Sequence, residues 1–167
     1  FEERHKDFYF GRDLLVAQLV QLISQHDLIL VAGASGSGKS SAVRAGVLPH
    51  LSAHFAQGRF RALVLTPDRD PFSSLRGALL AIGMPQAQLE ALDAATADSL
   101  YTTVTSLRPT DELWLLFVDQ FEELFTLCQD AGRQKAFLDG LTRIAQAPQQ
   151  EIKIALAMRA DFFDRFG

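Results

Sequence analysis

The sequence predicts an α/β fold with three layers, in which a mostly parallel sheet lies between two layers of helices. Four apolar segments, at residues 28–32, 62–66, 113–118 and 152–158, are typical of strands that are buried on both faces. Segments with helical periodicity separate them, and this alternation indicates parallel strands joined by helical crossovers. The 167 residues, of which 48% are hydrophobic, are enough for one domain with a substantial core.

The elements in the first half of the chain have recognisable ends. Asp13 is a typical N-cap for a helix whose apolar residues share one face, namely Leu15, Leu19, Leu22 and Ile23. The first strand follows and leads to a helix that we expect to begin near Gly38. After the second strand, Pro71 occupies the first position of a helix that Gly83 and Pro85 end.

The second half of the chain continues the same alternation. Residues 86–97 give no clear pattern, and the next helix is predicted from Leu100, Val104 and Leu107. Arg108 and Pro109 end that helix, because the residue before a proline disfavours helical backbone. Between the third and fourth strands we expect a helix through Phe137, Leu141 and Ile144, then a polar loop at 148–150.

The most informative motif directly follows the first strand. Residues 33–40 read GASGSGKS, the G-x-x-x-x-G-K-S pattern of a phosphate-binding P-loop, or Walker A motif. Glycines let the backbone turn its N–H groups toward an anion, and the positive end of the following helix points to the same place. The Lys39 ammonium is expected to reach the β- and γ-phosphates, and the Ser40 hydroxyl to bind Mg²⁺. The expected phosphate-binding residues are Gly33, Ser35, Gly36, Ser37, Gly38, Lys39, Ser40 and Ser41.

Acidic residues follow the third strand, where a P-loop fold places its second Mg²⁺ ligand. Asp119 is the expected ligand, and the alternative is that it caps a helix. Glu122 and Glu123 lie within one helical turn of it, so that either could orient or deprotonate an attacking water. The alternative is that both are acids that the helix dipole favours at a helix start.

A basic residue, Arg159, directly follows the fourth strand. Nucleotide sites of parallel sheets lie at the carboxyl ends of the strands, so we expect Arg159 to face the phosphates as a γ-phosphate sensor. The competing interpretation is an ion pair with Asp161 or Asp164.

The amino-acid composition limits which nucleotide, which partners and which cellular location we expect. The chain contains no Asn, so the guanine-reading Asn-Lys-x-Asp element is absent and ATP is favoured over GTP. The net charge of −4 argues against a nucleic-acid surface on these 167 residues, although a domain outside them could supply one. No apolar run approaches the roughly 18 residues of a membrane span, and residues 1–7 do not read as a signal peptide, so a cytoplasmic location is expected. The single Cys128 excludes an internal disulfide and is expected to be a buried or half-buried helix residue.

These motifs together resemble the STAND ATPases (signal-transduction ATPases with numerous domains), in particular their bacterial novel-STAND branch, which is related to the NACHT proteins. In NACHT proteins the Walker B Asp is followed by a small residue and then by acids three and four positions on. Asp119, Glu122 and Glu123 match that pattern, whereas Gln120 replaces the small residue. The resemblance covers nearly the whole chain, through residues 10–12, 33–49, 70–72, 118–125 and 159–162.

The resemblance implies roles for several residues. Glu123 is the first choice for the catalytic base and Glu122 the second, while Arg159 is the sensor. Phe10, Gly11 and Arg12 would lie near the adenine. In the family's fold, the fourth strand lies between the P-loop strand and the Walker B strand.

The resemblance also implies a place in a larger protein. Residues 1–167 are expected to be a single STAND-type core that is C-terminally truncated before a helical lid. Within it, residues 1–27 are the entry segment and N-terminal helix, and residues 28–167 run from Walker A to the sensor region. The function implied is an ATP/ADP switch with slow Mg²⁺-dependent hydrolysis, which self-oligomerises with ATP bound. Sensor repeats and an effector domain would lie outside these residues, and this piece alone should hydrolyse ATP weakly or not at all. The alternatives are an AAA+-type ATPase motor and a nucleotide-binding module that does not hydrolyse.

Overall fold

Four parallel strands form a single sheet in the order β1-β4-β3-β2. The strands are β1 (Leu28–Gly33), β2 (Phe60–Leu65), β3 (Leu113–Val118) and β4 (Ile152–Arg159). The sheet comes from a computed structural model, which describes residues 2–33, 39–54, 59–147 and 151–162, with side chains for 14–33, 41–53, 59–147 and 151–162. The predicted α/β class and the position of the fourth strand between the first and third are therefore confirmed.

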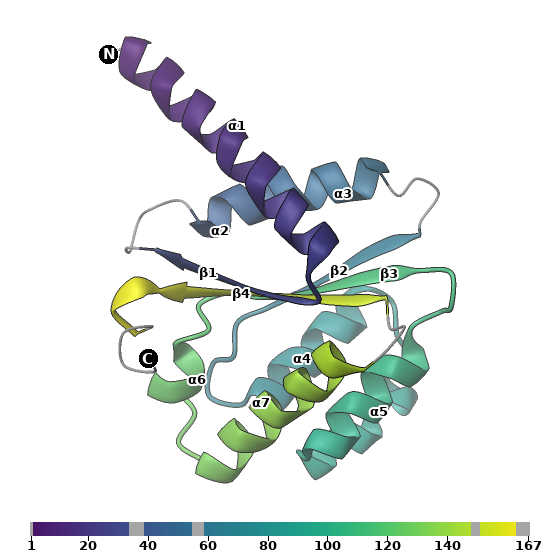
Figure 1. The fold of residues 1–167 in the computed structure, drawn as a ribbon. Helices are drawn as coiled ribbons and strands as arrows, with labels where there is room; N and C mark the ends of the chain where they lie inside the picture. Colours follow the sequence, from purple (N-terminus) through teal and green to yellow (C-terminus); the bar gives the residue numbers. More distant parts are fainter. Residues whose placement is uncertain (1, 34–38, 55–58, 148–150, 163–167) are drawn as a thin grey trace.

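Helices cover both faces of the sheet and complete the three layers (Figure 1). One face carries α1 (Glu2–Gln25) and a helical segment made of α2 (Lys39–Ala42), the π-helical turn η1 (Val43–Val47) and α3 (Leu48–His54). The other face carries α4 (Pro71–Ala81), α5 (Ala97–Leu107) and α7 (Ala131–Gln146). The short α6 (Glu123–Thr126) follows β3, and the stretch with no clear sequence pattern contains two 3₁₀ turns, η2 (Gln86–Gln88) and η3 (Glu90–Ala94).

The first helix is longer than the sequence analysis predicts. It begins at Glu2, so Asp13 lies inside α1 and the prediction that it caps the helix is wrong. Residues 2–12 contain no proline, and a single glycine is not enough to end a helix that packs elsewhere along its length. Leu19 and Ile23 are buried as expected, whereas Leu22 is 42% exposed and does not share their buried face.

Local capping explains the sharp beginnings of the later helices. The Asp70 carboxylate accepts the Phe72 N–H at 3.1 Å, with Pro71 in the first turn of α4 as predicted. At the start of α5, Thr96 and Ser99 form a reciprocal capping box. Asp130 caps α7 by accepting the Arg133 N–H at 3.1 Å.

Two apolar clusters hold the layers together, one on each face of the sheet. Successive residues of β3 alternate between them, because neighbouring side chains of a strand point to opposite faces. Trp114 and Leu116 pack toward α4, α5 and α7, while Leu115 and Phe117 pack toward α1 and the helical segment after β1. Every residue of β3 after Leu113 is buried, as its continuous apolar sequence predicts.

Cys128 is buried, 2% exposed, but it follows α6 in irregular backbone and is not a helix residue. Within the described ranges, none of the helices combines the length and apolarity that crossing a membrane requires.

Candidate functional site

The carboxyl ends of β1, β4 and β3 bring several of the predicted site residues to one edge of the sheet. Gly33, the last residue of β1, lies in register with Arg159, the last residue of β4. Asp119 directly follows β3, and the helix expected near Gly38 begins at Lys39 among the described residues. Parallel α/β sheets bind their ligands at this edge.

Much of the P-loop lies outside the described residues. Ser35, Gly36, Ser37 and Gly38 belong to that part of the sequence, as do Asp164 and the polar loop at 148–150. The backbone places Lys39 and Ser40 in the first turn of α2, with Ser41 exposed after them. Phe10, Gly11 and Arg12 lie in α1, also described by their backbone.

Asp119 is a buried carboxylate with a fixed orientation. The residue is 3% exposed, and its backbone N–H donates to the Leu65 carbonyl at 2.8 Å. Its Oδ1 accepts the Gln120 N–H at 2.9 Å, and its Oδ2 accepts Arg44 Nη2 at 3.2 Å. Asp119 caps no helix, because α6 begins four residues later, at Glu123.

The chain turns sharply after Asp119. Gln120 has a φ of 49°, a left-handed conformation that is uncommon for a residue with a side chain and is often found at functional sites. The next residue, Phe121, fixes the turn to β4 by donating its N–H to the Ala157 carbonyl at 2.8 Å. The Phe121 side chain is buried and meets Phe125 edge to face, with ring centroids 5.7 Å apart. Glu122 and Glu123 are therefore carried by a well-anchored turn.

The two glutamates differ in their surroundings. Glu122 is 9% exposed, and none of the described residues forms a hydrogen bond with its Oε2. Glu123 is half-buried, and its Oε1 accepts the Asp68 N–H at 3.2 Å. Burial raises the pKa of Glu123 above its ordinary value, the nearby carboxylates of Asp68, Glu122 and Asp119 raise it further, and the bond from the Asp68 N–H opposes the shift.

Arg159 makes the ion pair that the sequence analysis gave as the competing interpretation. Its Nη2 lies 3.0 Å from Asp161 Oδ2, and its guanidinium carbon lies 5.9 Å from the centroid of the Phe162 ring. The side chains of Arg159 and Asp161 are 46% and 60% exposed, so the pair contributes little stability. Such a pair can be exchanged for a phosphate at small cost.

Two residues of this edge were not assigned a role from the sequence. Arg44 pairs with Asp119, and the Asp68 backbone, with a φ of 54°, donates to Glu123. Arg44 lies four residues after Ser40, about one helical turn, and within the tract 33–49 that carries the family resemblance; both signals could have drawn attention to it. Asp68 gives no comparable signal, because its contribution is a backbone N–H.

The described residues contain no group of three or more His, Cys, Asp or Glu side chains arranged to hold a metal by themselves. A Mg²⁺ site of the kind expected here would not need one, because Mg²⁺ is commonly bound by one or two protein oxygens together with phosphates and waters. The buried Asp119 carboxylate supplies oxygens of that type.

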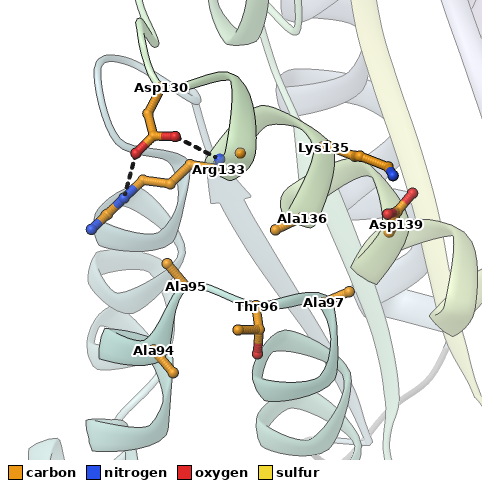
Figure 2. A pocket seen from close by; sticks show the side chains of 10 residues that line it. Ala94, Ala95, Thr96, Ala97, Asp130, Arg133, Lys135, Ala136 and Asp139 are labelled. Carbon is orange, nitrogen blue, oxygen red and sulfur yellow. Dashed lines mark hydrogen bonds and ion pairs between the residues drawn. The ribbon is translucent and has the colours of Figure 1, made fainter.

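A pocket of about 490 Å³ lies away from these residues, between the junction of η3 with α5 and the first turns of α7 (Figure 2). Its lining includes Thr96, Lys135 and the Asp130–Arg133 pair, in which Arg133 Nε lies 3.5 Å from Asp130 Oδ2. None of the predicted site residues lines it. Of its polar residues, Thr96 and Asp130 already cap helices, and Arg133 pairs with Asp130.

Comparison with known proteins identifies a family for the chain. The family model for Novel STAND NTPase 1 matches residues 1–167, which confirms the resemblance to the novel-STAND proteins. No curated protein sequence shows significant similarity to the chain.

Solved structures with the same fold include proteins named ORC. The Aeropyrum pernix ORC2 protein in its ADPNP–ADP complexes gives a TM-score of 0.57 at 14% identity, over 93% of this chain and 43% of that one. The Drosophila ORC bound to DNA gives 0.58 at 21% identity, over 94% of this chain and 40% of that one. The ADP form of the A. pernix protein gives 0.54 at 12% identity, over 89% of this chain and 40% of that one. The chain spans less than half the length of each of these proteins, and at these identities the similarity is one of fold.

Proposed function

Because the chain belongs to the Novel STAND NTPase 1 family, we propose that it is a signalling switch that binds ATP and ADP and hydrolyses ATP slowly with Mg²⁺. The observation that carries this proposal is the position of β4 between β1 and β3. That order gathers Gly33, Asp119 and Arg159 at one edge of the sheet, next to the helix that begins at Lys39. A P-loop, a buried carboxylate and an accessible guanidinium at one edge are what a triphosphate site requires.

The phosphates are bound mainly by the loop after β1. In the proposed complex Lys39 neutralises the β- and γ-phosphates, and the N-terminus of α2 adds the positive end of its dipole. Phe10, Gly11 and Arg12 lie near the adenine. The other phosphate contacts come from Gly33, Ser35, Gly36, Ser37, Gly38, Ser40 and Ser41.

The residues at the end of β3 suit Mg²⁺. Asp119 offers carboxylate oxygens in a fixed orientation, and the Ser40 hydroxyl is the second proposed protein ligand. When bound, the ion would neutralise charge on the phosphate oxygens during transfer. The Gln120 N–H and the Arg44 guanidinium hold the two oxygens of this carboxylate.

Glu123 is the proposed catalytic base and Glu122 the second choice. Glu123 is half-buried and is held by the Asp68 N–H, so that it remains open to a water molecule, whereas Glu122 is buried. The raised pKa of Glu123 makes its carboxylate a better proton acceptor. It takes a proton from water as the water oxygen attacks the γ-phosphorus, and the bond from that phosphorus to the β–γ bridging oxygen breaks to release ADP and inorganic phosphate. Arg159 exchanges its pairing with Asp161 for the γ-phosphate and so senses the triphosphate.

We further infer the place of this module in a larger protein. Residues 1–167 are a single STAND-type core that a helical lid follows, with residues 1–27 as the N-terminal segment and helix and 28–167 as the Walker A to sensor region. Sensor repeats and an effector domain complete the protein, which is bacterial and cytoplasmic and self-oligomerises when ATP is bound. In this proposal residues 1–167 themselves bind neither nucleic acid nor a membrane.

Loss of nucleotide binding in Lys39→Ala tests the proposal. The matched control is Lys135→Ala, which removes an exposed lysine on α7 at the pocket shown in Figure 2. Calorimetry should show that Lys39→Ala loses ATP and ADP binding while Lys135→Ala retains both, because Lys39 is the proposed phosphate-paired charge. Unchanged affinity in Lys39→Ala, or loss in Lys135→Ala alone, would place the nucleotide elsewhere.

A further inference from the structure

Arg44 joins the first turns after the P-loop to the carboxylate at the end of β3. It lies in the π-helical turn η1, five residues after Lys39, and its Nη2 reaches Asp119 Oδ2 at 3.2 Å across 75 residues of sequence. Its guanidinium carbon also lies 5.9 Å from the centroid of the Phe117 ring. π-helical turns within α-helices are frequent at functional sites.

The two members of this pair differ in exposure. The Asp119 side chain is 5% exposed and that of Arg44 is 48% exposed. A buried carboxylate interacts strongly with a nearby cation, while the exposed guanidinium is free to move toward water. The bond from the Gln120 N–H fixes Oδ1, so Arg44 acts mainly on Oδ2.

We propose that Arg44 is a positioning residue of the metal site, which holds the Asp119 carboxylate and competes with a divalent cation for its Oδ2. This inference rests on the proposed nucleotide site. Arg44 thereby sets how strongly nucleotide binding depends on Mg²⁺, because a metal must displace or share the guanidinium bond to reach that oxygen. In the absence of metal the guanidinium supplies the positive charge that limits repulsion between Asp119 and the phosphates.

A charge-removing variant gives a measurable consequence. In Arg44→Gln, Asp119 loses this cation, so its negative charge attracts Mg²⁺ more strongly and repels phosphate more strongly when Mg²⁺ is absent. The Mg²⁺ dependence is the ratio of the dissociation constant for ADP in EDTA to that in Mg²⁺. We expect Arg44→Gln to raise this ratio at least threefold, a change of about 0.7 kcal/mol. Arg44→Lys keeps the charge and should restore the ratio to near the wild-type value.

Arg143→Gln is the matched control. Arg143 forms an ion pair with Asp98 at 3.1 Å, its side chain is 46% exposed, and it lies over an aromatic ring, that of Tyr101. These features closely resemble those of Arg44, but the pair joins α5 to α7 away from the strand ends. Arg143→Gln should leave the ratio unchanged, which separates a local effect at Asp119 from a change in net charge.

The experiment measures ADP binding by calorimetry in both conditions for wild type and the three variants, with urea unfolding to check folding. If Arg44→Gln does not fold, Arg44→Met takes its place, because methionine keeps an unbranched apolar stem beside Phe117. An unchanged ratio, or equal loss of affinity in EDTA and Mg²⁺, would overturn the role of Arg44 while leaving the nucleotide site intact. Failure of the wild type to bind ADP in either condition would instead overturn the proposed function.

Discussion

Replacing Gly46 by alanine should weaken the packing of α1 against the helical segment made of α2, η1 and α3. That segment begins at Lys39, one of the candidate site residues. A Cβ built on Gly46 lies 2.3 Å from Val16 Cγ2 and 3.2 Å from Val16 Cγ1, whereas ordinary contact begins at 3.4 Å. Valine is stiff at χ1, so Val16 cannot simply rotate away, and α1 or the π-helical turn must shift. Overpacking of this kind costs about 1–3 kcal/mol, which exceeds the gain of up to about 1 kcal/mol from replacing a helical glycine.

Gly77→Ala provides the comparison within the same molecule. Gly77 lies inside α4, and its added Cβ would meet nothing within 4 Å, so alanine there should stabilise the protein by roughly 0.5–1 kcal/mol. Urea unfolding followed by circular dichroism gives the free energy of unfolding for each variant. Gly46→Ala should be less stable than wild type, and adding Val16→Ala should recover most of the loss. If Gly46→Ala is as stable as Gly77→Ala, the close contact between α1 and η1 does not exist in solution.

The remaining predictions concern the acidic residues. Asp119→Ala should weaken ADP binding in Mg²⁺ far more than in EDTA when both are measured by calorimetry, and equal loss in both would count against a metal role. In the full-length protein, Glu123→Gln should preserve ATP binding and slow phosphate release on the order of a hundredfold, the usual scale for a positioned base; if Glu122→Gln alone slows it, the choice between the two acids is wrong. The raised pKa of folded Glu123 means that its contribution favours folding at low pH and is lost as pH rises through that pKa. As the pH is raised from about 4 to about 7, the free energy of unfolding of Glu123→Gln relative to wild type should therefore increase in urea titrations. A decrease of this difference as the pH rises would contradict the pKa shift.

Local signals in the sequence predict the strands and most of the helices. Residues 113–118 form a continuous apolar run and fold as the buried β3, and Pro71 stands in the first turn of α4 as predicted. The α1 start is missed because residues 2–12 contain no proline and only one glycine, which does not end the helix, so that Asp13 resembles a cap only when its neighbours are ignored. The strand order came from the resemblance to a family, because periodicity does not tell which strands are neighbours.

The site is only partly predictable for a related reason. The P-loop and Asp119 are recognisable by their spacing from apolar strands, whereas the Arg44–Asp119 pair joins residues 75 positions apart and depends on the whole fold. Glu122 and Glu123 are neighbours with the same chemistry, and only the anchored turn after Asp119 buries one and leaves the other half-buried. Sequence spacing therefore identifies the candidate residues, whereas packing determines how exposed each side chain is.

Hydrogen exchange with and without Mg²⁺ and ADP tests the central claim most directly, namely that nucleotide binds at the carboxyl ends of β1, β3 and β4. Peptides covering residues 28–42, 118–124 and 156–161 should exchange more slowly with the nucleotide, while peptides from α5 and the first turns of α7, which line the pocket in Figure 2, should not change. Protection confined to α5 and α7, or no protection at saturating ADP, would contradict the account.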